Sequence, residues 1–242
     1  MLSFLTHTAT FRPLYWRCRR LIRQIIGRDV WAQPELSVPS SIVGNPGASW
    51  CVSYTELHKD SIVYSLGVGT DISFDRELIA RTGAIVHAFD PTPRSVEWIR
   101  TQHLPIEFVF HELGVADYDG FAYFAPPLNA THVSFSIERK SSPATRQAGV
   151  DRQVSRLDTI MKMLGHDRID VLKMDIEGSE YAVLATVLRE RLNIRQILVE
   201  FHHRFPEIGR RRTQDALKKL HRAGYRVFFI SENGDDYSLI KK

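Results

Sequence analysis

The sequence predicts an α/β fold in which a Rossmann-like, doubly wound and mostly parallel sheet ends in a C-terminal antiparallel hairpin. Strand-like apolar runs alternate with helix-like segments along the body of the chain, as in a parallel sheet covered on both faces. Near the C-terminus, two strand-like runs flank an Asn-Gly turn, which is typical of a hairpin. With 242 residues, 43% of them hydrophobic, the chain has room for one well-buried core.

The individual elements follow from β-branched apolar runs for strands and amphipathic runs for helices. The parallel strands are expected at residues 61–66, 84–89, 106–111, 169–174 and 196–201. The helices are expected at residues 72–82, 95–102, 179–191 and 212–223. The tail YRVFFISENGDDYSLI supplies the hairpin. Together these elements assign residues 61–242 to one domain.

The N-terminal segment, residues 1–28, is predicted to form a basic amphipathic helix. It carries six arginines and no Asp or Glu, and its apolar residues recur at the three-and-four spacing of one helical face. Such a helix packs on its own domain, packs across a dimer, or lies on an anionic membrane. Residues 10–27 are therefore the predicted place of a peripheral membrane contact or a dimer contact.

The rest of the chain holds 26 basic and 28 acidic residues, so it is nearly neutral and no nucleic-acid partner is predicted. Residues 29–60, with several Pro and Gly, are predicted to be a linker or cover segment. No apolar run is long enough to span a bilayer, and the two cysteines match no disulfide or metal spacing. We therefore expect a cytoplasmic protein, at most peripheral to a membrane, without a metal site.

One connection is longer than the fold requires. Between the third and fourth strands lie 57 residues, 112–168, whose middle is rich in aromatic, Pro, Ser, Thr and Asn residues. A compact α/β domain needs only a crossover there, so the surplus indicates a function. Ligands of such sheets bind beside the carboxyl ends of the strands. Residues 118–155, approximately, are therefore predicted to cover the substrate.

The stretch YSLGVGTDISFD predicts a cofactor site after the first strand. Gly67 and Gly69 stand between a strand and a helix, the context in which a Gly-x-Gly turn is credible. A dinucleotide fingerprint would have a third glycine in place of Ile72, and Asp71 would repel a pyrophosphate. Asp90 ends the second strand, where a carboxylate accepts hydrogen bonds from ribose hydroxyls. A ribose-bearing cation such as S-adenosylmethionine fits this pattern better than NAD, although a purely structural turn is the simpler alternative.

Four stretches resemble the motifs of FkbM-type methyltransferases: SIVYSLGVGTDISFD, VHAFDPTP, RLDTIMKMLGHDRIDVLKMDIEGSE and ILVEFH. Members of this family have the class I methyltransferase fold and depend on S-adenosylmethionine. The resemblance covers about residues 50–240 and implies a methyltransferase domain with S-adenosyl-L-methionine as its cofactor. It also implies O-methylation, often of sugars or secondary metabolites.

The same resemblance implies which residues bind the cofactor. Gly67, Gly69 and Asp71 would line its methionine end. Asp90 would bind the ribose, and Asp117 would approach the adenine edge. The full predicted set is Gly67, Val68, Gly69, Asp71, Phe74, Asp90, Pro91, Thr92, Asp117 and Asp175.

Methyl transfer to a hydroxyl benefits from a general base, because the acceptor must lose its proton. Candidates lie at the carboxyl edge of the sheet, where Asp175 and Glu177 follow the fourth strand. Glu200, His202 and His203 follow the fifth strand. The predicted catalytic residues are His202 as the base, with Asp175 or Glu177 orienting the acceptor. The structural alternative for the two acids is a charge that complements the dipole of the helix that follows them. The structural alternative for His202 is a side chain that is buried with its hydrogen bonds satisfied and has no catalytic role.

The sequence thus predicts an O-methyltransferase that acts on a hydroxyl of a small molecule or glycan. Two alternatives from other classes stay open. One is a non-catalytic cofactor-binding module that its basic helix recruits to a membrane or partner, and the other is a nucleotide-dependent oxidoreductase. Methylation of nucleic acids is disfavoured, because MDIEG stands where amino-methylating enzymes carry Asn or Asp before Pro-Pro and an aromatic residue.

Overall fold

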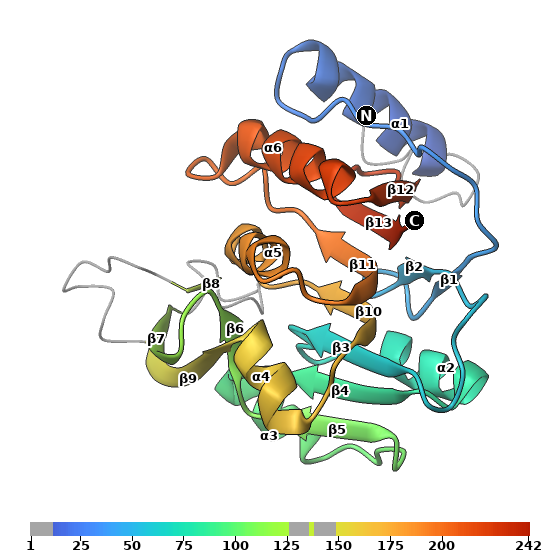
Figure 1. The fold of residues 1–242 in the computed structure, drawn as a ribbon. Coiled ribbons are helices and arrows are strands. Elements are labelled where there is room, and N and C mark those ends of the chain that lie inside the picture. The colour runs from blue at the N-terminus through green and yellow to red at the C-terminus, as the bar shows by residue number, and fades with distance from the viewer. Residues whose placement is uncertain (1–11, 126–135, 138–148) are drawn as a thin grey trace.

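The computed structural model describes residues 12–125, 136–137 and 149–242, with six helices and thirteen strands in those residues (Figure 1). The helices are α1 (Arg12–Ile25), α2 (Ser73–Thr82), α3 (Pro93–Ile99), α4 (Leu157–Leu164), α5 (Glu180–Arg189) and α6 (Gly209–Arg222). The strands up to the insert are β1 (Ser41–Val43), β2 (Trp50–Val52), β3 (Ile62–Leu66), β4 (Ile85–Phe89), β5 (Phe108–His111) and β6 (Gly114–Ala116). The remaining strands are β7 (Gly120–Ala125), β8 (Ser136–Ile137), β9 (Val150–Arg156), β10 (Ile169–Met174), β11 (Ile194–Glu200), β12 (Tyr225–Ile230) and β13 (Asp236–Lys241).

The main sheet has seven strands in the order β12-β13-β11-β10-β3-β4-β5. The five strands from β11 to β5 pair in parallel, and β13 pairs antiparallel with both β11 and β12. The predicted α/β class, with a mostly parallel sheet and a C-terminal hairpin, is confirmed. The strand order reverses between β3 and β10, because β4 and β5 follow on one side of β3 and β10 and β11 follow on the other. Ligands of such sheets bind at this point.

Two hydrophobic clusters cover the two faces of this sheet. Alternate residues of one strand belong to different clusters, as Val63 and Tyr64 of β3 do. One cluster packs the sheet against α4, α5 and α6, and the other packs it against α2, α3 and the β1–β2 hairpin. Because both faces are covered, the strands are mostly apolar rather than strictly alternating between apolar and polar residues.

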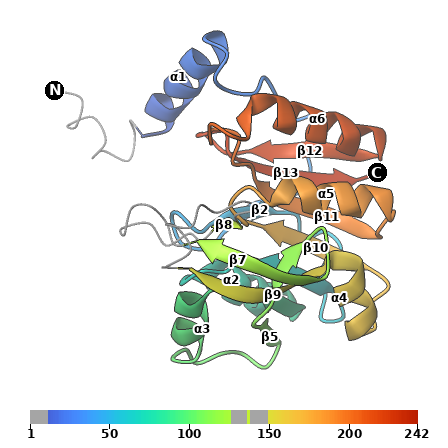
Figure 2. The same ribbon diagram turned by 90° about the vertical axis from the view of Figure 1, so that its left-hand side faces the viewer.

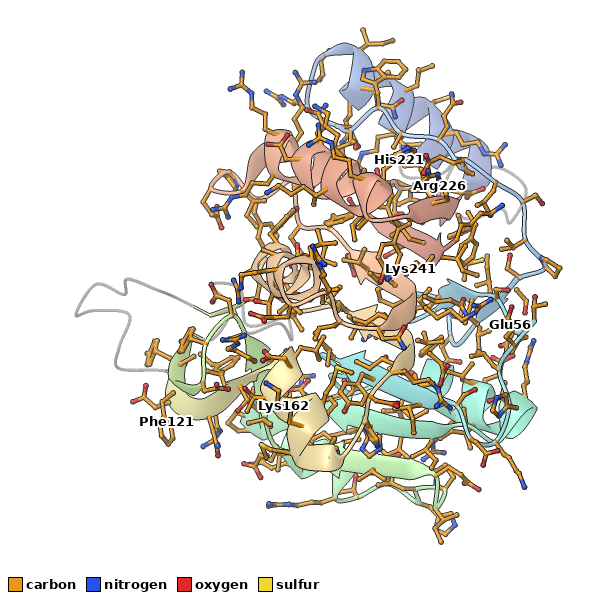
Figure 3. All side chains as sticks on the ribbon, viewed as in Figure 1. Glu56, Phe121, Lys162, His221, Arg226 and Lys241 are labelled. Carbon is orange, nitrogen blue, oxygen red and sulfur yellow. The ribbon has the colours of Figure 1, made fainter. Side chains whose placement is uncertain are left out.

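The long connection after β5 forms a second sheet, with the order β6-β9-β7-β8, and then helix α4. The sequence analysis did not expect this sheet or this helix. In Figure 1 the parallel strands of the main sheet point toward the side where the second sheet lies, and Figure 2 shows β7 and β9 in front of the main sheet. Phe121 of β7 is 72% exposed and points away from the body (Figure 3). Much of the predicted substrate cover, residues 126–135 and 138–148, lies outside the described residues.

The predicted linker, residues 29–60, contains the β1–β2 hairpin, which packs against α2. The predicted N-terminal helix is present as α1, and its expected first residues, 10 and 11, lie outside the described part. No helix in the described residues is both long and apolar enough to cross a membrane.

Candidate active site

A cavity of about 490 Å³ lies at the carboxyl ends of β3, β4, β10 and β11. Its size is typical of sites for small ligands. Most of its wall comes from the loops that follow these strands. Segment 47–50, at the start of β2, closes one side, and Gly114 and Phe124 of the second sheet contribute on another. The carboxyl edge of the sheet is therefore the candidate site, as expected for an open α/β sheet.

The turn after β3 brings two backbone segments unusually close together. Gly67 has a positive φ of 71°, and a Cβ atom there would lie 1.8 Å from the carbonyl oxygen of Asp175. No side chain fits in this position, which explains the first glycine. Gly69 also has a positive φ, 55°, but a Cβ atom there would meet nothing within 4 Å. Gly69 thus leaves open space beside a cavity that it lines.

Asp90 joins this turn to the loop after β4. Its Oδ2 accepts a hydrogen bond from the backbone N–H of Gly69 at 2.9 Å. Its Oδ1 accepts bonds from the N–H and the hydroxyl of Thr92, at 2.9 and 2.7 Å. A carboxylate oxygen has two lone pairs, so Oδ2 retains the capacity to accept one more bond from a ligand hydroxyl. The predicted ribose contact fits this geometry.

Asp71 accepts a hydrogen bond from the first residue of α2. Its carboxylate accepts bonds from the N–H of Ser73 at 2.8 Å and from the side-chain amide of Asn45 at 3.1 Å. Burial would raise the pKa of this carboxyl, but these hydrogen bonds lower it. Asp71 is therefore ionised at neutral pH and adds a negative charge to the rim of the cavity.

Nine of the ten predicted cofactor residues line this one cavity: Gly67, Val68, Gly69, Asp71, Phe74, Asp90, Pro91, Thr92 and Asp175. Asp117 follows β6 and is not among the residues that line it. The structure thus brings together all of the predicted set except Asp117. Their contacts with a cofactor stay predictions.

A buried charged group beneath the turn was not predicted. Asp75 of α2 is 2% exposed and lines the cavity, and burial raises its pKa to about 6 despite the positive charge of Lys173. The Lys173 ammonium donates to the carbonyl oxygens of Leu66 and Gly67 at 3.3 and 2.6 Å. It also lies 5.2 Å from the ring centre of Trp50. Lys173 thus holds the glycine turn in place. Asp75 stands three and four residues before Leu78 and Ile79, and this spacing could have indicated that Asp75 faces the core.

His202 lies behind the cavity wall, among carboxylates. Its Nε2 is 3.4 Å from Glu177 Oε2 and 3.7 Å from Asp175 Oδ1. Its backbone N–H donates to Glu180 Oε1 at 3.0 Å, and its Nδ1 lies 3.4 Å from the same oxygen. The three predicted catalytic residues, His202, Asp175 and Glu177, are therefore adjacent, although only the two acids line the cavity.

The charge state of His202 argues against its predicted role as the base. Burial alone would lower the pKa of its imidazole, but the hydrogen bond with Glu180 and the charges of Glu180 and Glu177 raise it to about 10. At neutral pH the ring is an imidazolium, which has no free lone pair to accept a proton. The base role of His202 stays a prediction, but the geometry favours His202 as the counter-ion of the acids around it.

The loop after β10 is held in an unusual conformation. Glu177 has a positive φ of 48°, which is rare for residues other than glycine. The next residue, Gly178, donates its N–H to Glu180 Oε2 at 2.8 Å. Glu180 is completely buried, so this one carboxylate connects the loops after β10 and β11. Glu180 belongs to the segment KMDIEGSE, which carries the family resemblance, but the sequence predicted no role for it.

Two further acids face the cavity: Glu200, a candidate at the end of the fifth strand that was not chosen as the base, and Asp236, which was not predicted. Glu200 ends β11 and Asp236 begins β13, and both line the cavity. Burial, together with the charges of Asp175 and Asp236, raises the pKa of the Glu200 carboxyl. Ligand atoms of Asp175, Glu200 and His202 lie within 4.8 Å of one another. These three residues are the group of the described chain that could hold a metal ion.

His203, next to the predicted base, has a structural place. Its Nε2 lies 3.0 Å from Asp29 Oδ1, and both side chains are fully buried. Arg204 bonds the other oxygen of Asp29 at 2.7 Å and also pairs with Asp235 of the β12–β13 turn. This network ties the segment after α1 to a turn whose Asn233 lines the cavity.

The fold and the site define the class of the protein. The protein has the class I methyltransferase architecture. Its seven-stranded sheet ends in an antiparallel hairpin, and the glycine turn and Asp90 lie where the strand order reverses. Residues 60–227 match the family model described as "Methyltransferase FkbM domain". The chain belongs to this family. S-adenosylmethionine is accordingly the cofactor of its domain, and the oxidoreductase alternative is not supported.

Two curated relatives are each described as "Probable methyltransferase-like protein 24". The human protein is 29% identical over 151 residues, which cover 62% of this chain and 34% of that protein. The rat protein is 28% identical over 181 residues, which cover 70% of this chain and 43% of that protein. The chain thus spans less than half the length of these curated relatives.

Solved structures with a similar fold include an FkbM methyltransferase from Methylobacillus flagellatus, with a TM-score of 0.48 and 16% identity over 76% of this chain and 44% of that chain. Another is fibrillarin from Aeropyrum pernix with natively bound S-adenosyl-L-methionine, with a TM-score of 0.39 and 10% identity over 88% of this chain and 85% of that chain. The family assignment rests on the domain match.

Proposed function

We propose that this chain is an S-adenosylmethionine-dependent O-methyltransferase that acts on a hydroxyl of a small molecule or glycan. The observation that carries the proposal is the position of Glu200, a carboxylate with a raised pKa in the cavity that the glycine turn also lines. A hydroxyl acceptor must lose its proton during transfer. Burial raises the pKa of the Glu200 carboxyl to about 8, so its ionised form is a stronger proton acceptor than an ordinary carboxylate. The base would be the ionised fraction of Glu200, which grows as the pH rises toward 8 and above.

The neighbouring residues have distinct roles in this proposal. When bound, S-adenosylmethionine supplies a methyl group on a sulfonium, a good leaving group. Asp175 and Glu177 line the cavity and orient the acceptor hydroxyl toward the transfer position. The His202 imidazolium, 3.4 Å from Glu177 and 3.7 Å from Asp175, holds these two side chains in place. Glu200, in its ionised form, then takes the proton.

The cavity lining narrows the class of acceptor. Seven acids line the cavity, namely Asp71, Asp75, Asp90, Asp175, Glu177, Glu200 and Asp236. Lys173 is the one basic residue among the described residues of the lining. This balance disfavours phosphorylated or carboxylated acceptors, because like charges repel. The aromatic rings of Trp50, Phe89 and Phe124 provide flat apolar surface, which suits a neutral sugar or a polyketide-like hydroxyl compound.

A methyl-transfer screen over hydroxylated acceptors tests the proposal. We expect a neutral sugar or secondary metabolite to gain the mass of one methyl group, detected by mass spectrometry of the product. Phosphorylated analogues of the same acceptor should react much more slowly. Binding of S-adenosylmethionine in calorimetry without transfer to any hydroxyl would instead support the non-catalytic module.

Two substitutions separate the candidate bases. If Glu200 is the base, Glu200→Gln should lower kcat by about 10²–10⁴-fold while the affinity for S-adenosylmethionine changes little. His202→Gln should then lower kcat less, because the proton acceptor remains. The reverse order would restore His202 as the base. Glu207→Gln, at an exposed position after β11, is the matched control and should leave kcat unchanged.

The cytoplasmic location belongs to the same proposal. Fractionation of cells that express the tagged chain tests it. Recovery of the chain from a secreted or luminal fraction would contradict it.

A further inference from the structure

Helix α1 lies at one end of the molecule, beside α6 and far from β5, as both ribbon views show (Figures 1 and 2). It meets the body of the protein with its polar side. The amide of Gln24, in a side chain that is largely buried, donates to the carbonyl of Val30 at 2.9 Å. The guanidinium of Arg20 donates to the carbonyl of Ala32 at 3.3 Å. The helix is thus anchored by hydrogen bonds rather than by its apolar stripe.

The apolar stripe faces solvent. Leu21, Ile22, Ile25 and Ile26, together with Trp31 after the helix, are between 48% and 69% exposed, and we call them the outer face of α1. The indole N–H of Trp31 donates to the carbonyl of Gln24 at 3.2 Å, which fixes this ring at the end of the helix. An amphipathic helix that packs on its own domain would bury these residues. Their exposure indicates that another apolar surface covers them.

The charges around the outer face indicate what that surface is. Arg17 stands one turn before Leu21, and Arg19 stands one turn before Ile22, so an exposed arginine borders each side of the stripe. Residues 12–28 contain no acid, and the first one, Asp29, is fully buried in its pair with Arg204. We propose that the outer face of α1 docks on an anionic phospholipid surface, with its apolar side chains among the acyl chains and its arginines at the phosphates.

The physical basis is that of interfacial helices. Buried apolar area and attraction between arginines and anionic lipids both contribute to binding, and tryptophan favours the same interface. A second copy of the chain fits less well, because a symmetric contact between two outer faces would bring the bordering arginines of both copies together. The β12–β13 turn contacts α1 at the border of the outer face, where Arg17 lies 3.8 Å from Glu232, and on the inner side, where Arg20 lies over Gly234. Asn233 of that turn lines the cavity, so the docked helix has the cavity loop directly behind it.

Sedimentation of the whole chain with vesicles tests the proposal. We expect binding to vesicles of phosphatidylcholine and phosphatidylserine that weakens with added salt, and little binding to phosphatidylcholine alone. The double variant Ile22→Asp and Ile25→Asp should reduce the bound fraction at least about tenfold. Both positions are already exposed, so the fold should be retained, which circular dichroism and thermal melting check.

The matched control is the double variant Ile106→Asp and Met163→Asp, which adds the same charges at exposed apolar positions away from α1. It should bind vesicles as the unchanged chain does. Equal binding by the Ile22 and Ile25 variant, or no binding by the unchanged chain, would overturn the proposal. Loss of a concentration-dependent dimer in that variant, without lipid binding by the unchanged chain, would show that the outer face joins two copies instead.

Discussion

At the scale of single residues, the two glycines of the turn after β3 are predicted to respond differently to alanine. Gly67→Ala would place a methyl group against the carbonyl oxygen of Asp175, so one of two backbone segments must move. We expect a loss of about 3 kcal/mol or more in the free energy of unfolding. Gly69→Ala meets open space and should cost only the strain of its positive φ, about 1 kcal/mol.

The affinity for S-adenosylmethionine gives a second measurement of the same pair. Gly69→Ala should still unfold cooperatively but bind the cofactor about tenfold more weakly, because its new methyl group occupies space that Gly69 leaves open beside the cavity. Urea titration and calorimetry measure the two effects separately. If both variants were as stable as the unchanged chain, the close approach of Gly67 and Asp175 would be wrong.

Replacing Glu177 by glycine is predicted to stabilise the fold and to lower the activity. Its positive φ strains the loop after β10, and Glu177→Gly should raise the free energy of unfolding by about 1 kcal/mol. The same change removes a carboxylate that orients the acceptor, so kcat should fall about tenfold or more. Arg191 is the matched control, because it also has a positive φ, 51°, and lies in an exposed turn after α5.

Arg191→Gly should gain similar stability and leave kcat unchanged. Thermal melting and initial rates with the acceptor from the screen provide both measurements. A Glu177→Gly variant with unchanged kcat would remove Glu177 from the acceptor site.

At the scale of elements, the sequence was most informative where patterns are long. The predicted strand at 169–174 matches β10, and the others begin or end within two residues of β3, β4, β5 and β11. The hairpin β1–β2 was missed because each of its strands has three residues, too few to show a period. The sheet of the insert was missed because β7 and β9 pair across a long stretch of sequence.

Some residues of the candidate site could likewise be inferred from the sequence, and others could not. The glycine turn and Asp90 follow strand ends, so their meeting at one edge could be inferred from the strands. Glu200 ends β11, so its place at this edge could be inferred in the same way. Glu180 bonds the loop after β11 from α5, and Asp236 reaches the cavity from β13. No local pattern reports such contacts. The protonation of His202 likewise depends on how many carboxylates surround it, which only the fold determines.

A histidine cluster on β4 and β5 should make stability depend on pH. His87 Nδ1 lies 3.0 Å from His111 Nε2, and the Tyr64 hydroxyl lies 2.8 Å from His166 Nδ1. Burial, and then the charges of His166 and His111, lower the pKa of His87 from 6.5 to about 4. The folded state therefore resists protonation in a range where the unfolded chain takes up the proton. Stability should fall as the pH drops from about 6.5 to about 4.

His87→Phe tests this dependence, because a phenyl ring keeps the aromatic contacts but does not titrate. Between pH 7 and pH 4.5, the unchanged chain should lose about 2 kcal/mol more than the variant in the free energy of unfolding. Urea titrations at both pH values measure the difference. His58→Gln, at an exposed position, should keep the full dependence. Equal slopes for His87→Phe and the unchanged chain would contradict the assignment.

At the scale of the whole molecule, the C-terminal hairpin forms part of the cavity wall, and the segment after α1 holds that hairpin in place. The segment after α1 contributes Asp29 to the network with Arg204, and the C-terminal hairpin contributes Asn233 and Asp236 to the lining. The five parallel strands position the cofactor turn, whereas segment 47–50 and the C-terminal hairpin add to the wall around the acids. The cavity wall therefore forms only when the whole domain is folded. The negative charges of its acids are offset by positive charges from other elements.

This balance leads to a prediction about metals. The carboxylates of Asp175, Glu177 and Glu180 already surround one positive charge, the His202 imidazolium. A divalent cation held by Asp175, Glu200 and His202 would have to displace the proton on Nε2, and metal ligation requires the neutral ring. We expect dialysis against EDTA to leave methyl transfer and the affinity for S-adenosylmethionine unchanged, measured with the acceptor from the screen. Loss of transfer that Mg²⁺ or Mn²⁺ restores, and that Asp175→Asn makes permanent, would instead show that these three residues hold a catalytic ion.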